Sequence, residues 1–397
     1  MRVHPAVVRL VCAVGVAGAI AWFAPVRSVH AAADDLPGPF DAAGIERSAN
    51  ACTNFFDYAT GAWRAAHPIP ASYGEYGYIE ALEDQTQNLV REVVESAAQH
   101  PGAAGSATQK IGDFYASCMD TAAIERDGIN PIKPELARID AVNSVAALDD
   151  EISHLHTIGV PAGFSLRSGQ NPHDSTHVIA NVGQGGVRLP ERGYYFRDDA
   201  ASQKLREQYV THIGAMLALL GDPDSAKSAH DVMVIETALA DASLAAAERR
   251  DPKNTDHPMK ADAVAALMPH FPFATYLRDQ HVPSGGTMNV AVPKFLTAFD
   301  TELIKEPLPA WRSYLRWQLV ETAATALPKR FDDEQFAFNG TILGGVKEQQ
   351  PRWKRCVRST DAALGMDVGQ VYVARAFPPS AKKQAVDMTL RMRDAYR

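Results

Sequence analysis

The segment Gln184-Gly-Gly-Val-Arg-Leu-Pro-Glu-Arg-Gly-Tyr-Tyr-Phe196 is the most informative stretch of this 397-residue chain. Directly before it, between Ala162 and Val182, apolar residues alternate with other residues, which predicts a small β-hairpin. On both sides of this region most segments carry apolar residues at three- and four-residue spacing, the pattern of α-helices. The sequence therefore predicts a mainly α, multi-helical fold that contains one small β-hairpin.

The helical segments also carry start and stop signals. Ser106, Ser144 and Asp224 can cap the first turns of helices, and Gly221-Asp-Pro223 ends one helix before the next begins. The last segment, 380–397, favours a helix but reaches the end of the sequence without a cap, so we expect a truncated chain. The predicted helices are Thr86–Ala98, Ala107–Asp120, Val145–Ile158, Ala201–Leu220, Asp224–Arg249, Pro309–Leu327 and Gly365–Phe377.

The first 33 residues have the form of a secretory signal peptide. Basic Arg2 and Arg9 precede an apolar run over 10–25, and small residues at Ala31–Ala33 offer a cleavage site. A membrane anchor is the alternative, but Gly and Pro interrupt the run, and a span needs roughly 18 or more apolar residues. We expect a secreted or periplasmic protein without a stable membrane anchor, with a polar linker over 34–48.

Charge and cysteine content narrow the possible functions. The formal charge is -8, or about -11 once the three arginines of the leader are removed, which argues against nucleic-acid binding. Cys52, Cys118 and Cys356 remain after the leader, in what should be an oxidising compartment. One thiol must be left over if two of them pair, and three unpaired buried thiols are the alternative.

No residue pattern in the chain supplies a catalytic centre. None of the thirteen histidines is followed by glutamate, so the zinc-peptidase motif His-Glu-x-x-His is absent. His173 and His177 have the spacing of a metal site, but Pro172 and the turn-forming residues between them predict a loop or hairpin surface. Glu151 and His154 resemble half of a carboxylate-bridged metal site, but the second copy that such sites need is missing, so we expect both to be partly exposed helix residues. We expect no catalytic and no metal-binding residues in this chain.

Nine separated motifs resemble, in order, those of the neprilysin-like zinc metallopeptidases, peptidase family M13. The resemblance covers residues 49–397. The motifs are Cys52–Trp63, Asp113–Asp120, Gln184–Phe196, Glu236 with Leu239-Ala240, Glu248–Pro252, Trp311–Trp317, Phe336–Gly340, Arg352–Cys356 and Gly369–Val373.

The resemblance implies that 49–397 is the family's N-terminal helical domain, which encloses the substrate, and that the C-terminal catalytic zinc domain is absent. It implies a disulfide between Cys118 and Cys356, positions that pair in disulfide-rich members. Glu75 and Glu83 stand where some members carry two arginines that grip a substrate carboxylate. These two positions are then substrate-facing but acidic, so a grip of that kind is not expected here.

The resemblance therefore predicts the N-terminal part of an exported zinc metalloendopeptidase that acts in proteolysis. Zinc would belong to the complete enzyme, no cofactor would be bound by this chain, and the chain alone would be inactive. Peptides or a separately encoded catalytic part are the expected partners. The alternative is a non-enzymatic module of the periplasm that binds peptides or another protein.

Overall fold

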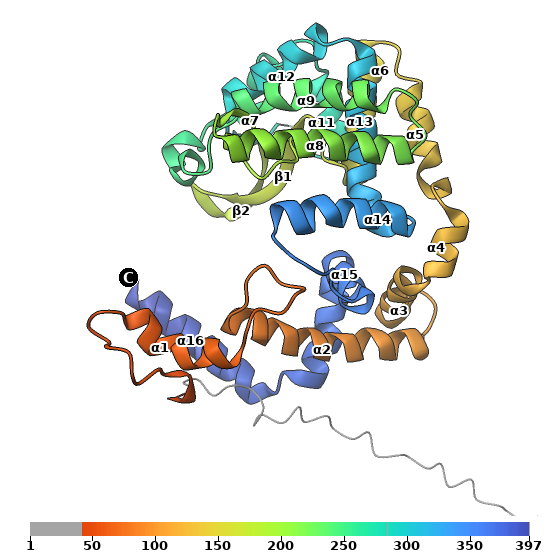
Figure 1. Ribbon diagram of the computed structural model, residues 1–397. Helices are drawn as coiled ribbons and strands as arrows, with labels where there is room; N and C mark the ends of the chain where they lie inside the picture. The colour runs from red at the N-terminus through yellow and green to blue at the C-terminus, as the bar shows by residue number, and fades with distance from the viewer. Residues whose placement is uncertain (1–41, 284, 397) are drawn as a thin grey trace, which may run out of the picture.

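The computed structural model describes residues 42–283 and 285–396. The predicted signal peptide, 1–33, and the first residues of the predicted linker, 34–41, lie outside the described residues. The described chain folds into two bodies, which we call the upper lobe (121–343) and the lower lobe (42–119 together with 352–396), as Figure 1 shows. Nearly all elements are helices, and the mainly α prediction is confirmed.

The lower lobe is built from two parts of the chain that are far apart in sequence. Its core is formed where α2 packs against α3 and α15, around Val94, Ile111, Tyr115 and Val357. Its main elements are α1 (Phe55–Ala66), α2 (Tyr78–Gln99), α3 (Ala107–Met119), α15 (Arg352–Ala376) and α16 (Pro379–Ala395), with a short 3₁₀ turn at Ala42–Gly44.

The upper lobe has the larger core, which is rich in aromatic side chains such as Trp311, Tyr314 and Phe331. Its α-helices are α4 (Thr121–Asp127), α5 (Lys133–Asp140), α6 (Val145–Thr157), α7 (Gly193–Phe196), α8 (Ala200–Leu219), α9 (Ser225–Ala242), α10 (Ala261–Ala265), α11 (Phe273–Asp279), α12 (Pro293–Lys305), α13 (Leu308–Ala323) and α14 (Lys329–Gln335). Short 3₁₀ turns lie at Asn130–Ile132, Glu248–Arg250, Pro252–Asn254 and Ala324–Ala326, and a π-helix, η6, spans Phe336–Leu343.

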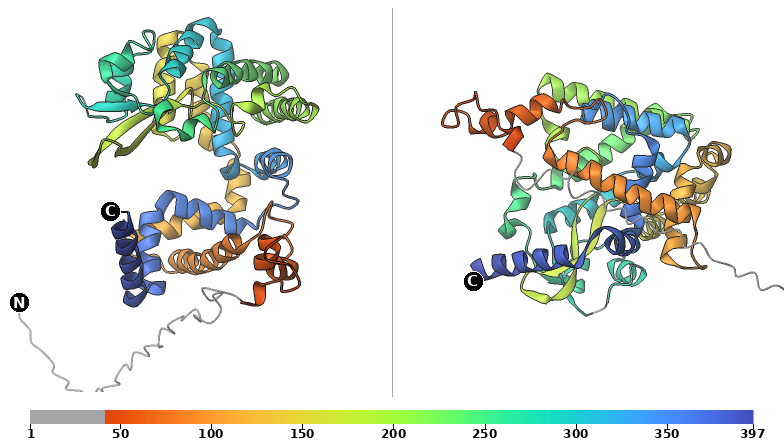
Figure 2. Two further views of the ribbon diagram at one scale, coloured as in Figure 1. Left: turned by 90° about the vertical axis from the view of Figure 1, so that its left-hand side faces the viewer. Right: turned by 90° about the horizontal axis from the view of Figure 1, so that it is seen from below.

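The predicted hairpin is part of a larger sheet. Strands β1 (Phe164–Asn171) and β2 (Asp174–Gln184) form the hairpin, and β2 also pairs in parallel with β4 (Thr287–Val290), which pairs with β3 (Pro258–Lys260). The sheet order is β1-β2-β4-β3. Figure 2 shows the hairpin projecting from the side of the upper lobe that is nearer to the lower lobe.

Several helix boundaries follow the local signals and others do not. Ser106 and Ser144 accept bonds from the backbone N–H groups of Gln109 and Ala147, as N-caps do. Asp224 precedes α9 but makes no side-chain capping bond. The prediction of a helix to residue 249 was wrong, because α9 ends at Ala242 and the chain turns away there.

The two lobes are joined by two crossings of the chain. The first is Asp120 alone, which ends α3 and caps α4 by accepting a bond from the backbone N–H of Ala123 at 2.9 Å. The second is the segment 344–351, which we call the connector, between η6 and α15. None of the helices among residues 42–283 and 285–396 is both long enough and apolar enough to cross a membrane.

A buried carboxylate lies at the centre of the upper lobe. Glu236 on α9 is fully buried, and its two oxygens accept bonds from the hydroxyls of Tyr195 and Tyr209, each at 2.7 Å, and from the indole N–H of Trp317 at 3.0 Å. Burial raises the pKa of Glu236, while these donors and the nearby Arg188 guanidinium oppose the rise. The carboxylate thereby connects α7, α8, α9 and α13.

The segment 184–196, which is the most informative stretch of the sequence, folds around the Glu236 carboxylate. The Tyr195 hydroxyl accepts a bond from the backbone N–H of Leu189 at 3.2 Å, and the Gly186 carbonyl accepts one from the Tyr314 hydroxyl at 2.7 Å. Gly186 has φ +71, and a Cβ there would lie 2.4 Å from the Tyr314 hydroxyl oxygen and 2.5 Å from the Gly163 carbonyl oxygen. Only glycine fits, so the segment most informative in sequence is a packing element of the upper lobe.

We expect Glu236→Gln to destabilise the protein by about 2–4 kcal/mol, since the amide NH₂ would face buried donors and each donor left unsatisfied costs about 1–3 kcal/mol. Guanidinium unfolding curves measure the change. Glu207→Gln, at an exposed position of α8, is the matched control and should change stability by less than about 0.5 kcal/mol. Equal midpoints for the two variants would contradict the role assigned to Glu236.

Candidate functional site

The described residues contain no group that fits a zinc ion. Within residues 42–283 and 285–396, no three His, Cys, Asp or Glu side chains converge as metal ligands. Zinc in proteins is held by three or four such groups. The side chains present do not fit the metal of a zinc peptidase, and no step of zinc chemistry can be derived from them.

The histidines of the two sequence patterns contact single carboxylates instead. His173 and His177 lie at the exposed end of the β1–β2 hairpin, beside Asp256 and Asp174 respectively. On α6, His154 lies 2.6 Å from a carboxylate oxygen of Glu135. The hairpin-surface prediction for the first pair is confirmed.

The second pattern is more buried than its sequence suggests. The prediction that both residues are partly exposed is confirmed for His154. It is wrong for Glu151, which is only 3% exposed. Glu151 pairs with Arg138 at 3.0 Å, and burial is the largest cause of its raised pKa. The ion pair between Arg138 and Glu151 therefore joins α5 to α6.

One buried carboxyl group, that of Asp149, has the altered acidity that catalytic groups often show. Burial, followed by the charges of Asp150 and Asp300, raises the pKa of Asp149 to about 7. Asp300 is already bound by His270, through its backbone N–H at 2.9 Å and its ring Nδ1 at 2.8 Å. Neither of the two cavities described next is lined by Asp149 or Asp300, so we assign both residues to the interior of the upper lobe.

Two small cavities open on the upper lobe. One, of about 190 Å³, is lined by residues that include Leu136, Leu217 and Arg316, and the other, of about 130 Å³, lies between Gln184–Arg192 and Leu244. Ligand sites in proteins usually occupy about 300–1,000 Å³. Neither cavity is large enough for a peptide.

The two acidic positions at which a substrate grip was considered both lie in the lower lobe. Glu75 is exposed in the loop before α2. Glu83, on α2, is exposed as well, accepts a bond from the Gln87 amide at 2.8 Å and pairs with Arg358 at 3.0 Å. No described contact joins Glu75 to Glu83. That they face a substrate stays a prediction.

The lower lobe carries an extensive exposed apolar surface. Of the twenty large apolar side chains that the described residues expose, fifteen belong to this lobe. Helix α16 has no buried residue, although it carries four of these exposed side chains and a fifth, that of Tyr396, directly follows it. We call the part on α15 and α16 the lower-lobe apolar surface; it comprises Met366, Val373, Phe377, Val386, Met388, Leu390, Met392 and Tyr396. Exposure of many large apolar side chains on two neighbouring helices favours an interaction site.

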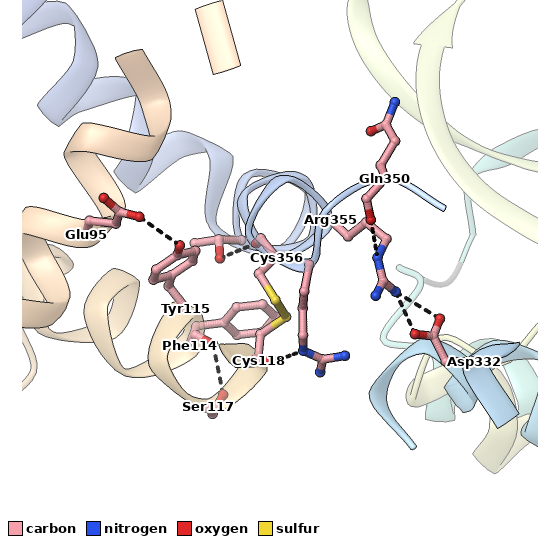
Figure 3. Close-up of a disulfide and its surroundings, with 11 residues drawn as sticks. Glu95, Phe114, Tyr115, Ser117, Cys118, Asp332, Gln350, Arg355 and Cys356 are labelled. Carbon is pink, nitrogen blue, oxygen red and sulfur yellow. Dashed lines mark hydrogen bonds and ion pairs between the residues drawn. A yellow bond between two sulfur atoms is a disulfide. The ribbon is translucent and has the colours of Figure 1, made fainter. Parts of the chain in front are cut away.

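A disulfide fastens the two crossings to each other inside the lower lobe. Cys118 in the last turn of α3 is joined to Cys356 in the second turn of α15, with an S–S distance of 1.99 Å and a Cα–Cα distance of 5.7 Å (Figure 3). This is the pair that the resemblance implies. Cys52 is free and exposed. Beside the disulfide, the Arg352 guanidinium donates to the Cys118 carbonyl at 2.8 Å.

The two lobes with their large helical core match a known family. The family model described as "Peptidase family M13" matches residues 51–397. The chain belongs to peptidase family M13. The resemblance inferred from the nine motifs is thereby confirmed.

Among curated proteins, this M13 chain is similar to the endothelin-converting enzyme 1 of Bos taurus and to neprilysin-3 of Drosophila melanogaster. The first is 24% identical over 370 residues, and the match covers 89% of this chain and 48% of that protein. The second is 25% identical over 376 residues, with the same two coverages. The chain spans about half the length of the curated relatives it matches.

Solved structures of M13 proteins have the same fold. The zinc metalloprotease Zmp1 of Mycobacterium tuberculosis, in complex with an inhibitor, superposes with a TM-score of 0.81 at 29% identity, covering 89% of this chain and 54% of that one. A structure of Zmp1 in an open state gives 0.74 at 30% identity, covering 86% and 53%. PepO from Lactobacillus rhamnosis shares the fold, with a TM-score of 0.75 at 19% identity and coverages of 87% and 54%.

Sequence reasoning missed the contacts at the connector. Asp332, Gln349 and Arg355 meet there, and no spacing rule connects them, because they belong to three separate elements. The motif Arg352–Cys356 was the available signal, since it places three basic residues within the four positions before a cysteine. Its acidic partner could not be chosen from the sequence.

Breaking the disulfide should destabilise this M13 chain without unfolding the upper lobe. We expect Cys118→Ser to lower the free energy of unfolding by about 2–5 kcal/mol, because the bond closes a long loop of the unfolded chain. Thermal unfolding followed by circular dichroism measures this. Cys52→Ser, which removes a free thiol, is the control and should be neutral.

Peptide mapping by mass spectrometry without reductant should recover the peptides of Cys118 and Cys356 as one linked species. Free thiols at both positions would refute the pairing.

Proposed function

We propose that this chain is the substrate-enclosing, non-catalytic part of an exported M13 zinc metalloendopeptidase. In this proposal the zinc ion and the groups that activate water belong to a separate catalytic part, on the same polypeptide or on a second one. The chain by itself binds no zinc and hydrolyses no peptides. The family match to zinc metalloproteases such as Zmp1 supports the reaction class.

The observation that carries the proposal is the lower-lobe apolar surface. Exposed fractions reach 85% at Met366 and 90% at Tyr396, and α16 buries none of its side chains. An isolated helix of this length is marginally stable in water, and helices in proteins are stabilised mainly by packing of an apolar face. The surface therefore needs a partner, and the catalytic part of an M13 enzyme is the partner that we propose.

The cysteines and the leader support export. The structure pairs Cys118 with Cys356, and disulfides of this kind persist in oxidising compartments outside the cytosol. Together with the leader-like residues 1–33, this supports a secreted or periplasmic location in a bacterium.

We expect purified residues 34–397, supplied with zinc, to cleave a mixture of fluorogenic peptides no faster than a blank without protein, because no set of zinc ligands converges among residues 42–283 and 285–396. An M13 enzyme of full length is the positive control. Zinc-dependent cleavage that a chelator abolishes would overturn the proposal.

The apolar surface itself can be tested with a dye that fluoresces on apolar protein surfaces, such as anilinonaphthalene sulfonate. We expect the triple variant Val386→Ser, Met388→Ser and Leu390→Ser to lose roughly half of the dye fluorescence, since dye binding follows exposed apolar area. Val178→Ser, at a 72% exposed position of the upper lobe, is the control and should leave the signal unchanged. Equal fluorescence of the wild type and the triple variant would count against an open docking surface on α16.

A further inference from the structure

The carboxylate of Asp332, on α14 of the upper lobe, accepts hydrogen bonds from the connector and from α15 of the lower lobe. Asp332 on α14 is 4% exposed, and its two oxygens lie 2.9 and 2.8 Å from one guanidinium nitrogen of Arg355 on α15. The amide of Gln349, in the connector, donates to the same carboxylate at 2.9 Å. Figure 3 shows Asp332 on its own ribbon, facing Arg355 beside the disulfide.

Asp332 is fixed to the upper lobe. Phe331, next to it, is fully buried in the upper core, and on the same helix Glu334 contacts the buried His212 of α8 at 2.9 Å. The Gln335 amide donates to the Glu321 carbonyl of α13 at 3.2 Å. Helix α14 therefore moves with the upper lobe.

Arg355 is fixed to the lower lobe. Cys356, its neighbour in sequence, is bonded to α3 and is 1% exposed, and Thr360, one turn later, is fully buried. Helix α15 packs along α2 and α3. The contact between Asp332 and Arg355 consequently bridges two bodies, each of which is held by its own core.

Two adjacent residues of the connector, Val346 and Lys347, form backbone hydrogen bonds to different lobes. The Val346 N–H donates to the Gly340 carbonyl of η6 at 2.9 Å, whereas the Lys347 N–H donates to the Ala71 carbonyl of the lower lobe at 3.0 Å. Gly345, just before, has φ +65. The backbone can pivot at this point, so side-chain contacts across the crossing decide the angle that it takes.

The charges at the crossing make the carboxylate indispensable to this arrangement. Arg352 and Arg355 both lie on the first turn of α15, and one terminal nitrogen of Arg352 is buried without a hydrogen-bond partner. Burial, and then the charge of Arg355, lowers the pKa of Arg352, while Asp332 opposes this. Without Asp332, the Arg355 guanidinium would lose the carboxylate that it contacts, and a largely buried charge without a partner is strongly destabilised.

We propose that Asp332 is an electrostatic latch that holds the two lobes at their observed angle, and that its neutralisation lets the lobes swing apart at Val346–Lys347. The latch is a property of this chain and does not depend on the function proposed above. The contact between Asp332 and Arg355 is a single ion pair, so the latch favours one angle between the lobes and does not make the joint rigid.

The distance between two spin labels, one on each lobe, tests the latch. Labels are attached at Glu92→Cys on α2 and Lys204→Cys on α8, both exposed positions. The protein used is 34–397 with Cys52→Ser, in which the remaining native cysteines, Cys118 and Cys356, are paired in the disulfide. We expect Asp332→Asn to shift the distance distribution measured by double electron–electron resonance to longer values and to broaden it.

Asp333→Asn is the matched control. Asp333 is the next residue on α14, is exposed, and pairs only with Lys329 of its own helix among the described contacts. This variant removes the same charge without touching the crossing, and its distribution should coincide with that of the unsubstituted protein. A shift in Asp332→Asn alone supports the latch. Coincident distributions for Asp332→Asn and the unsubstituted protein, or equal shifts in both variants, overturn it.

Circular dichroism of each labelled variant shows whether it has kept its helices. If Asp332→Asn unfolds, Arg355→Gln removes the other side of the same contact from a less buried position, with a side-chain exposure of 23%. The same shift to longer distances is then expected. An unshifted distribution for a folded Arg355→Gln variant overturns the latch.

Discussion

The fully buried carboxylate of Glu236 is the interaction on which the upper lobe depends. An ionised group in an apolar interior is tolerated only when donors replace the water that it has lost. Tyr195, Tyr209 and Trp317 provide them, and Arg188 lies close enough to oppose the cost of burial. Each donor comes from a different part of the chain, so satisfying one carboxylate fixes the relative positions of four helices and of the segment 184–196.

This arrangement explains how packing constrains the most informative stretch of the sequence. Its glycine at 186 allows the backbone to approach Gly163 and Tyr314, and its Tyr195 reaches Glu236. Such constraints are independent of the substrate. Family membership can therefore be recognised from the segment 184–196, which holds no metal ligand.

The local features of the fold could be predicted from the sequence, and the long-range ones could not. Ser106 and Ser144 predict helix starts because each capping bond joins the serine hydroxyl to the backbone N–H three residues later. The hairpin was predictable from its alternation, but its pairing with β4 joins residues more than a hundred positions apart, as in Val182↔Val290. No periodicity in one segment can reveal its partner at that distance.

The candidate site shows the same division. The pairing of Cys118 with Cys356 came from resemblance to a family, since spacing alone left three cysteines with several possible states. Asp332 and Arg355 were out of reach because a surface-like run of charged residues, Lys329–Gln335, gave no sign that one of its two adjacent aspartates is buried. Burial of that single residue depends on how two bodies meet.

The disulfide holds together the helices of the lower lobe that adjoin the two crossings, since the Cα atoms of Cys118 on α3 and Cys356 on α15 lie 5.7 Å apart. Two bodies attached at neighbouring points behave as a lever with a short inner arm. Rotation by a small angle at that attachment displaces the remote ends of α8 and α16 much further than the attachment itself. Changes of a fraction of an ångström among a few side chains are in this way amplified into the separation between the outer edges of the molecule.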